Sequence, residues 1–153
     1  MRVAFYKSSV GGISDKVVAW WTSPFSDKFN GEWKTGYSHV EFVFHDGLMF
    51  SASPVAGKCR FAEFSGSSSW DVVTINMEPL VEDTVRSFCK NLEGLKYDYL
   101  GILGFVFGNP DSGDRWFCSE VVSAGLKIVG ELPYEVTPST ISPNKLYNLL
   151  EED

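Results

Sequence analysis

The pentapeptide WFCSE at residues 116–120 places Cys118 at the point where an extended apolar run turns into a helix. After Cys118, apolar residues recur with helical spacing until Gly130, and glycine favours the position just past a helix C-terminus. The sequence therefore predicts a helix that begins at or within one residue of Cys118. The N–H groups and the positive dipole of a helix N-terminus stabilise a thiolate, and the same N–H groups can hold an oxyanion. A cysteine nucleophile needs both features, and it also needs a base.

The best predicted strand of the chain, residues 37–45, carries a histidine and a glutamate. Strict alternation puts four of its residues on one face: Tyr37, His39, Glu41 and Val43. An Asp-Gly pair at residues 46–47 then predicts a hairpin turn, with residues 48–53 as the returning strand. Apolar neighbours on both faces indicate that the first strand is largely buried, and a buried Glu41 requires a partner.

If the helix that starts at Cys118 packs against the face that carries His39, the thiol and the imidazole meet. His39 then takes the thiol proton and later gives it to a leaving group, while Glu41 orients the imidazole. Ser51 on the returning strand is the rival for this third role, since sequence fixes the register only to one or two residues, and Ser53 is a weaker rival. A zinc site of His39, Glu41 and Cys118 matches no zinc spacing, so we expect neither a metal nor a cofactor.

The composition limits the classes of protein to which this chain belongs. Its 153 residues suit one domain, residues 1–153, large enough to bury a core without disulfides. A net charge of −7 argues against nucleic acid as a ligand, because phosphate binding needs clustered Lys and Arg. The oligomeric state does not follow from the sequence.

Three scattered cysteines predict no disulfide framework and read as reduced thiols, with Cys59 and Cys89 filling the core. Residues 1–6 are too short an apolar stretch for a signal peptide, so we expect a cytoplasmic protein. The longest apolar run, residues 100–108, is too short to span a membrane.

Other elements follow from periodicity and turn signals. Strands are predicted at residues 2–6, 60–64 and 71–77. Helices are predicted at residues 14–21, 81–92 and 144–150, and the glycine-rich stretch 97–108 is taken as mostly helical.

Three segments together resemble the circularly permuted papain-like amidases, the YiiX-like branch of the NlpC superfamily: YSHVE at 37–41, YDYLG at 97–101 and FCSE at 117–120. In that family the strand with the histidine precedes the helix with the cysteine. The resemblance covers about residues 13–130.

The resemblance implies a single α+β domain with a central antiparallel sheet, a nucleophile at Cys118 and a base at His39. The family's third polar residue commonly lies on the strand next to the histidine, which favours Ser51. We keep Glu41 first because its carboxylate can stabilise an imidazolium.

The expected activity is hydrolysis of an amide bond, in a peptide or a peptidoglycan-type linkage, by a cysteine peptidase or amidase of bacterial or phage type. A lipid acyltransferase or lipase, as in the lecithin retinol acyltransferase relatives, is the alternative. It would use an apolar entrance, for which the sequence offers four aromatic residues: Trp20, Trp21, Phe25 and Phe29. An inactive module that binds a partner in the same cleft is the third possibility.

Overall fold

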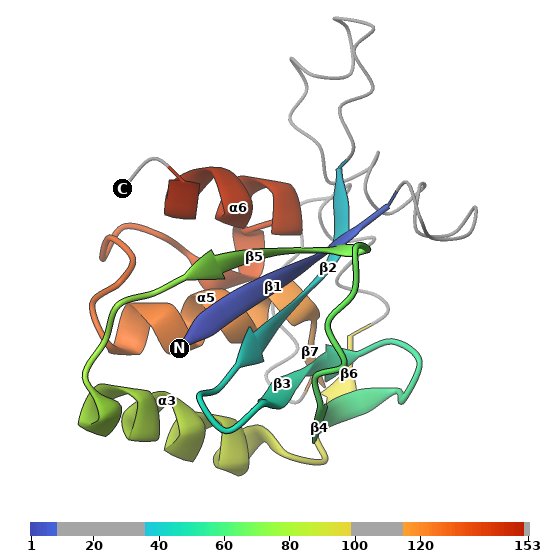
Figure 1. Cartoon of the computed structure of the whole chain (residues 1–153), viewed down its shortest axis with the longest axis horizontal. Coiled ribbons are helices and arrows are strands. Elements are labelled where there is room, and N and C mark those ends of the chain that lie inside the picture. The colour runs from blue at the N-terminus through green and yellow to red at the C-terminus, as the bar shows by residue number, and fades with distance from the viewer. Residues whose placement is uncertain (9–35, 99–114, 152–153) are drawn as a thin grey trace, which may run out of the picture.

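The computed structural model describes residues 1–8, 36–98 and 115–151 of the chain. These residues form an α+β unit in which α-helices pack on a seven-stranded sheet (Figure 1). The strands are β1 (Arg2–Lys7), β2 (Tyr37–Val43), β3 (Leu48–Ser53), β4 (Lys58–Glu63), β5 (Trp70–Thr74), β6 (Lys96–Tyr97) and β7 (Arg115–Trp116). The helices are α3 (Pro79–Leu92), α5 (Cys118–Ile128) and α6 (Pro143–Glu151), with a short 3₁₀ helix η1 (Pro138–Thr140). The α+β class predicted from the sequence is confirmed.

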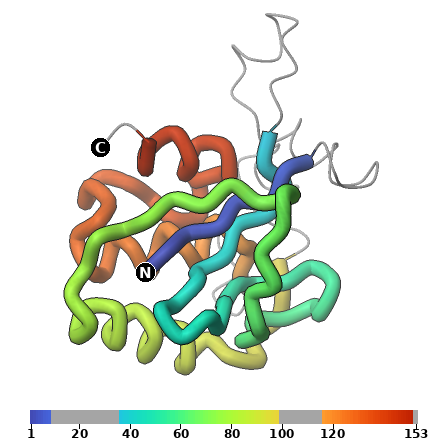
Figure 2. Tube along the Cα trace, viewed as in Figure 1, coloured from blue at the N-terminus to red at the C-terminus, as the bar shows by residue number. Residues whose placement is uncertain are grey.

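The sheet has the strand order β5-β1-β2-β3-β4-β6-β7. Neighbouring strands are antiparallel except for the short parallel pair of β6 and β7. The first strand of the chain thus lies inside the sheet, between β5 and β2, as the tube in Figure 2 shows. Because β7 leads directly into α5, the sheet also fixes where that helix begins.

The predicted hairpin joins β2 and β3. Gly47 has a φ of 86° at the turn, a conformation that glycine adopts without steric cost. Phe42 lies opposite Phe50 and Val43 opposite Met49, so the register that the sequence left open is now fixed.

Strict alternation along β2 is wrong at Tyr37. The pairing with β1 shifts between Tyr6, opposite His39, and Lys7, opposite Tyr37. This irregularity turns the Tyr37 ring into the core, 5.3 Å from the ring of Phe5. His39 and Glu41 therefore share a face of β2 without Tyr37.

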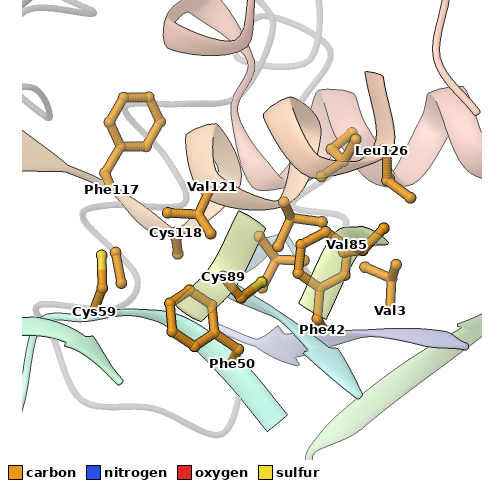
Figure 3. Packing of buried hydrophobic residues seen from close by; sticks show 14 of the residues in the cluster. Val3, Phe42, Phe50, Cys59, Val85, Cys89, Phe117, Cys118, Val121 and Leu126 are labelled. Carbon is orange, nitrogen blue, oxygen red and sulfur yellow. The ribbon is translucent and has the colours of Figure 1, made fainter. Parts of the chain in front are cut away.

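Helix α5 packs on β2 and β3, α6 packs on β2, and α3 packs on α5. The approach of α5 to β2 is close enough to require glycine, since a Cβ on Gly125 would lie 2.7 Å from Cζ of Phe42. The apolar cluster between α5 and the sheet includes Phe50, Val121 and Leu126 (Figure 3). Helix α5 is thereby held at a fixed place over the strands that carry the hairpin.

Most element boundaries match the prediction within two residues. Strand β5 is shorter than predicted, because β1 begins at Arg2 and pairs there with Thr74. The predicted helix at 14–21 and most of the glycine-rich stretch 97–108 lie outside the described residues. Among the described residues, none of the helices is long and apolar enough to cross a membrane.

Candidate active site

Cys118 is the first residue of α5, as the sequence predicts. Phe117 before it is extended, and its carbonyl accepts the first helical hydrogen bond, from the N–H of Val121 at 3.1 Å. The N–H groups of Cys118 and Ser119 belong to the first turn, where a helix supplies no carbonyl partner. In Figure 3 the Cys118 side chain points from α5 towards the sheet, and the residue is 3 % exposed.

His39 and Glu41 interact directly on β2. Nε2 of His39 lies 2.7 Å from Oε1 of Glu41. The Glu41 side chain is 2 % exposed and that of His39 is 15 % exposed, so the pair is largely shielded from solvent. The partner that a buried glutamate requires is therefore, in part, the histidine two residues away.

Cys118 is close enough to the imidazole of His39 to affect the pKa of that ring. Burial favours the neutral ring, but the Cys118 thiolate and then the Glu41 carboxylate outweigh it and raise the pKa of His39 to about 10. Since Nε2 is bonded to Glu41, Nδ1 is the ring nitrogen left for the sulfur. Nδ1 is buried and has no hydrogen-bond partner among the described residues. The arrangement can hold a thiolate beside an imidazolium.

Arg60 on β4 is a fourth group at this site, and the local sequence patterns do not predict it. Its Nη2 lies 3.3 Å from the same Oε1 of Glu41 that His39 contacts. Burial opposes ionisation of Glu41, yet His39 and then Arg60 lower the pKa of its carboxyl below the usual value. The only signal for Arg60 is register: it pairs with Ser51, and the side chain reaches past β3 to β2.

Ser51, the rival third residue, uses its hydroxyl elsewhere. Its Oγ donates to the carbonyl of Val40 at 2.8 Å, and the residue is fully buried. Ser53, the weaker rival, accepts a hydrogen bond from the N–H of Ala56 at 3.2 Å. Of the three candidates from the sequence, Glu41 is the one that contacts the imidazole.

Aromatic rings border the imidazole. The ring of Trp70 on β5 is 6.3 Å from that of His39 in an edge-to-face arrangement. Trp70 in turn contacts Tyr6 at 5.1 Å and Phe64 at 5.6 Å. The aromatic residues proposed for an apolar entrance, Trp20, Trp21, Phe25 and Phe29, lie outside the described residues.

The other two cysteines are buried, as predicted. Cys59 and Cys89 are both fully buried and free. Burial raises the pKa of the Cys59 thiol to about 11 and that of Cys89 further still. These two thiols are therefore held protonated at neutral pH and serve as internal references for Cys118.

Within residues 1–8, 36–98 and 115–151, His, Cys, Asp and Glu side chains form no group of three or more that could hold a metal ion. Comparison of the chain with protein-family models, curated proteins and solved structures gives no match. Any statement about activity therefore rests on the geometry of His39, Glu41, Arg60 and Cys118.

Proposed function

We propose that this protein is a cysteine hydrolase that cleaves an amide bond, in a peptide or a peptidoglycan-type linkage. One observation carries the proposal. A thiol at the first residue of a helix interacts with a histidine whose other ring nitrogen is bonded to a buried carboxylate. Nucleophile, base and orienting group thus occur in the order that nucleophilic catalysis requires.

In the first half of the reaction Cys118 gives its proton to Nδ1 of His39, and the sulfur attacks the carbonyl carbon of the substrate. The N–H groups at the start of α5 stabilise the negative charge that develops on the carbonyl oxygen. The C–N bond then breaks, and the proton on His39 passes to the leaving nitrogen. The products of this half are an amine and a thioester on Cys118.

In the second half a water molecule gives a proton to Nδ1 of His39 and attacks the thioester carbon. The C–S bond breaks, the acid leaves, and the proton returns to the thiol. Glu41 holds the ring in one orientation through Nε2 and stabilises the imidazolium in both halves. No electron donor or cofactor takes part in these steps.

We also propose that the fold is the circularly permuted papain-like one. Two features support it. The strand that carries His39 comes before the helix that carries Cys118 in the chain, and that helix packs on the same strand and on the next one, β3. Glu41 at two residues from the histidine departs from the usual third residue on the neighbouring strand.

The first test uses 4-nitrophenyl acetate as an activated acyl donor. We expect a burst of one nitrophenolate per chain, with the acetyl group on Cys118 as located by peptide mass spectrometry. Cys118→Ala should remove the burst, and Cys59→Ala is the matched control that keeps it, since Cys59 is fully buried. Acetylation at Cys59 or Cys89 instead, or no acetyl-enzyme at all, would refute the assignment of Cys118 as nucleophile.

The second test addresses the bond that is cleaved. Muropeptides and unmodified peptides are incubated with wild type and with Cys118→Ala, and new amino groups are measured. Release by wild type alone supports an amidase. A protein that forms the acetyl-enzyme and releases no amino groups, but frees fatty acid from ester-linked lipids in a parallel incubation, would instead be a lipase.

A further inference from the structure

We propose that Arg60 is a positioning residue for His39 and that it acts through the shared carboxylate oxygen of Glu41. This inference rests on the proposed hydrolase function, because it assigns Arg60 a part in the proton transfers of His39. Arg60 is two strands away from His39 in the sheet, and in sequence it is 21 residues away.

The geometry of the shared oxygen is unusual for an arginine. Arginine and carboxylate groups frequently pair through two parallel hydrogen bonds. Here Nη2 of Arg60 contacts only Oε1 of Glu41, at 3.3 Å, and Nε2 of His39 contacts the same atom at 2.7 Å. Nη1 of Arg60 and Oε2 of Glu41 are buried and have no hydrogen-bond partner among the described residues. Arg60 and His39 thus compete for one oxygen.

The groups around the imidazole come from several elements of the described fold. Glu41 lies on the same strand, Arg60 comes from β4, and Cys118 comes from α5. Tyr6 on β1 is the cross-strand neighbour of His39, and Trp70 on β5 adds an uncharged ring. Arg60 is therefore the permanent cation within reach of the carboxylate that orients the ring.

Two consequences follow for the proton on His39. When the ring is neutral, Arg60 still compensates the buried charge of Glu41, so the carboxylate stays ionised through the whole cycle. When the ring is charged, Nη2 of Arg60 competes with Nε2 of His39 for the same oxygen, and the positive charge of Arg60 disfavours the imidazolium. Arg60 thereby limits how tightly His39 holds the proton that it must give to the leaving group.

The direct test measures the titration of His39 by NMR in Cys118→Ala, which removes the influence of the thiol. The chain has two histidines, so loss of one resonance in His39→Ala assigns the signal. We expect Arg60→Met in this background to raise the His39 midpoint by about one pH unit, the usual size for removal of a like charge at this range. Arg60→Lys should keep most of the original midpoint. Lys90→Met on the exposed side of α3 is the control for net charge and should leave it unchanged.

The second readout uses the protein with Cys118 present and follows the pH profile of its alkylation. A more tightly held imidazolium should move the acid limb of the profile to lower pH in Arg60→Met and leave it in place in Lys90→Met. If circular dichroism shows that Arg60→Met does not fold, Arg60→Gln replaces it in both experiments. Equal His39 midpoints in Arg60→Met and Lys90→Met would refute the inference and leave the hydrolase proposal standing. A wild-type protein without an acetyl-enzyme would refute the hydrolase proposal, whatever the Arg60 variants show.

Discussion

The chain holds two histidine–glutamate pairs, His39 with Glu41 and His45 with Glu82, and they differ in the burial of the imidazole. In both pairs the carboxylate is almost fully buried, at 2 % and 6 % exposure. The His39 side chain is 15 % exposed, whereas that of His45 is 68 % exposed. The buried ring is beside a thiol, and the exposed ring is at the tip of the β2–β3 hairpin.

The second difference is in what else contacts the carboxylate. Glu82 on α3 accepts the backbone N–H of His45 at 2.9 Å and lies 3.3 Å from the amino group of Met1 and 3.8 Å from Arg86. Burial opposes ionisation, but the contacts with His45 and then Met1 lower the pKa of Glu82. This carboxylate ties the hairpin turn, the start of β1 and α3 together, and the His45 ring is one of several partners.

Glu41, in contrast, has His39 and Arg60 as its charged partners in the described residues. A buried carboxylate with several cations serves the fold, while one with a histidine that also faces a thiol can serve a proton transfer. The pair itself is thus a poor indicator of function. The contact of the ring with Cys118 is what separates the two sites.

The largest effect on stability should come from Glu82. Glu82→Gln leaves the buried amine of Met1 without a negative partner, whereas Arg86 keeps Asp46 at 2.9 Å, so we expect the free energy of unfolding to fall by about 3 kcal/mol. Urea denaturation measures it. Acetylation of Cys118 under native conditions should be unchanged, and a lost acetyl-enzyme in a folded Glu82→Gln protein would contradict the separation of the two pairs.

Glu41→Gln should lower the stability less than Glu82→Gln does, but it should slow the reaction of Cys118. It leaves Arg60, which is 25 % exposed, with a weaker partner, and we expect a stability loss of about 2 kcal/mol, the range for hydrogen bonds to charged groups. Alkylation of Cys118 at neutral pH should slow by about tenfold, because the imidazolium beside the thiolate loses its counter-charge. Unchanged alkylation would show that Glu41 does not act on the thiol through His39.

Local sequence patterns predict part of this site, and the rest depends on how the strands pair. Helix periodicity and Gly130 put Cys118 at a helix start, and the two-residue spacing put His39 and Glu41 on one face, because both rules depend on local geometry alone. Arg60 depends on the register of β3 with β4, which no local pattern determines. The shift at Tyr37 likewise depends on pairing with β1.

Ser51 is a residue for which the local sequence pattern suggested a role that its contacts do not support. Position and residue type made it a candidate for the third role, but its hydroxyl bonds the carbonyl of Val40 on the neighbouring strand. Whether a serine hydroxyl is available is set by the nearest backbone acceptor, which the sequence does not reveal.

The pH dependence of the unfolding free energy at acidic pH tests whether Glu41 is stabilised as a carboxylate in the folded protein. The pKa of Glu41 is lowered on folding from its usual 4.5, so its contribution is present above about pH 4.5 and is lost as the pH falls through the lower, folded-state value. Glutamine does not titrate. The difference in unfolding free energy between wild type and Glu41→Gln should therefore shrink as the pH falls below about 4.5. Urea denaturation on both sides of this pH tests it, and a constant difference would mean that folding does not lower the pKa of Glu41.

The smallest effect should come from His45. Its ring is 68 % exposed, and the backbone N–H that bonds Glu82 remains in an alanine variant. We expect His45→Ala to change the unfolding free energy by less than about 1 kcal/mol. Urea denaturation checks this value, and a loss as large as that of Glu82→Gln would show that the exposed ring is the main partner of the carboxylate.

The measurement that tests the coupling of thiol and imidazole most directly is the rate of alkylation by iodoacetamide at each cysteine as a function of pH, in wild type, His39→Ala and His45→Ala. The account predicts that wild-type Cys118 reacts at neutral pH while Cys59 and Cys89, which burial keeps protonated, do not. His39→Ala should slow the reaction of Cys118 by at least about tenfold at pH 7, and His45→Ala should leave it unchanged. Equal rates in the two histidine variants, or a Cys118 as inert as Cys59, would contradict the account.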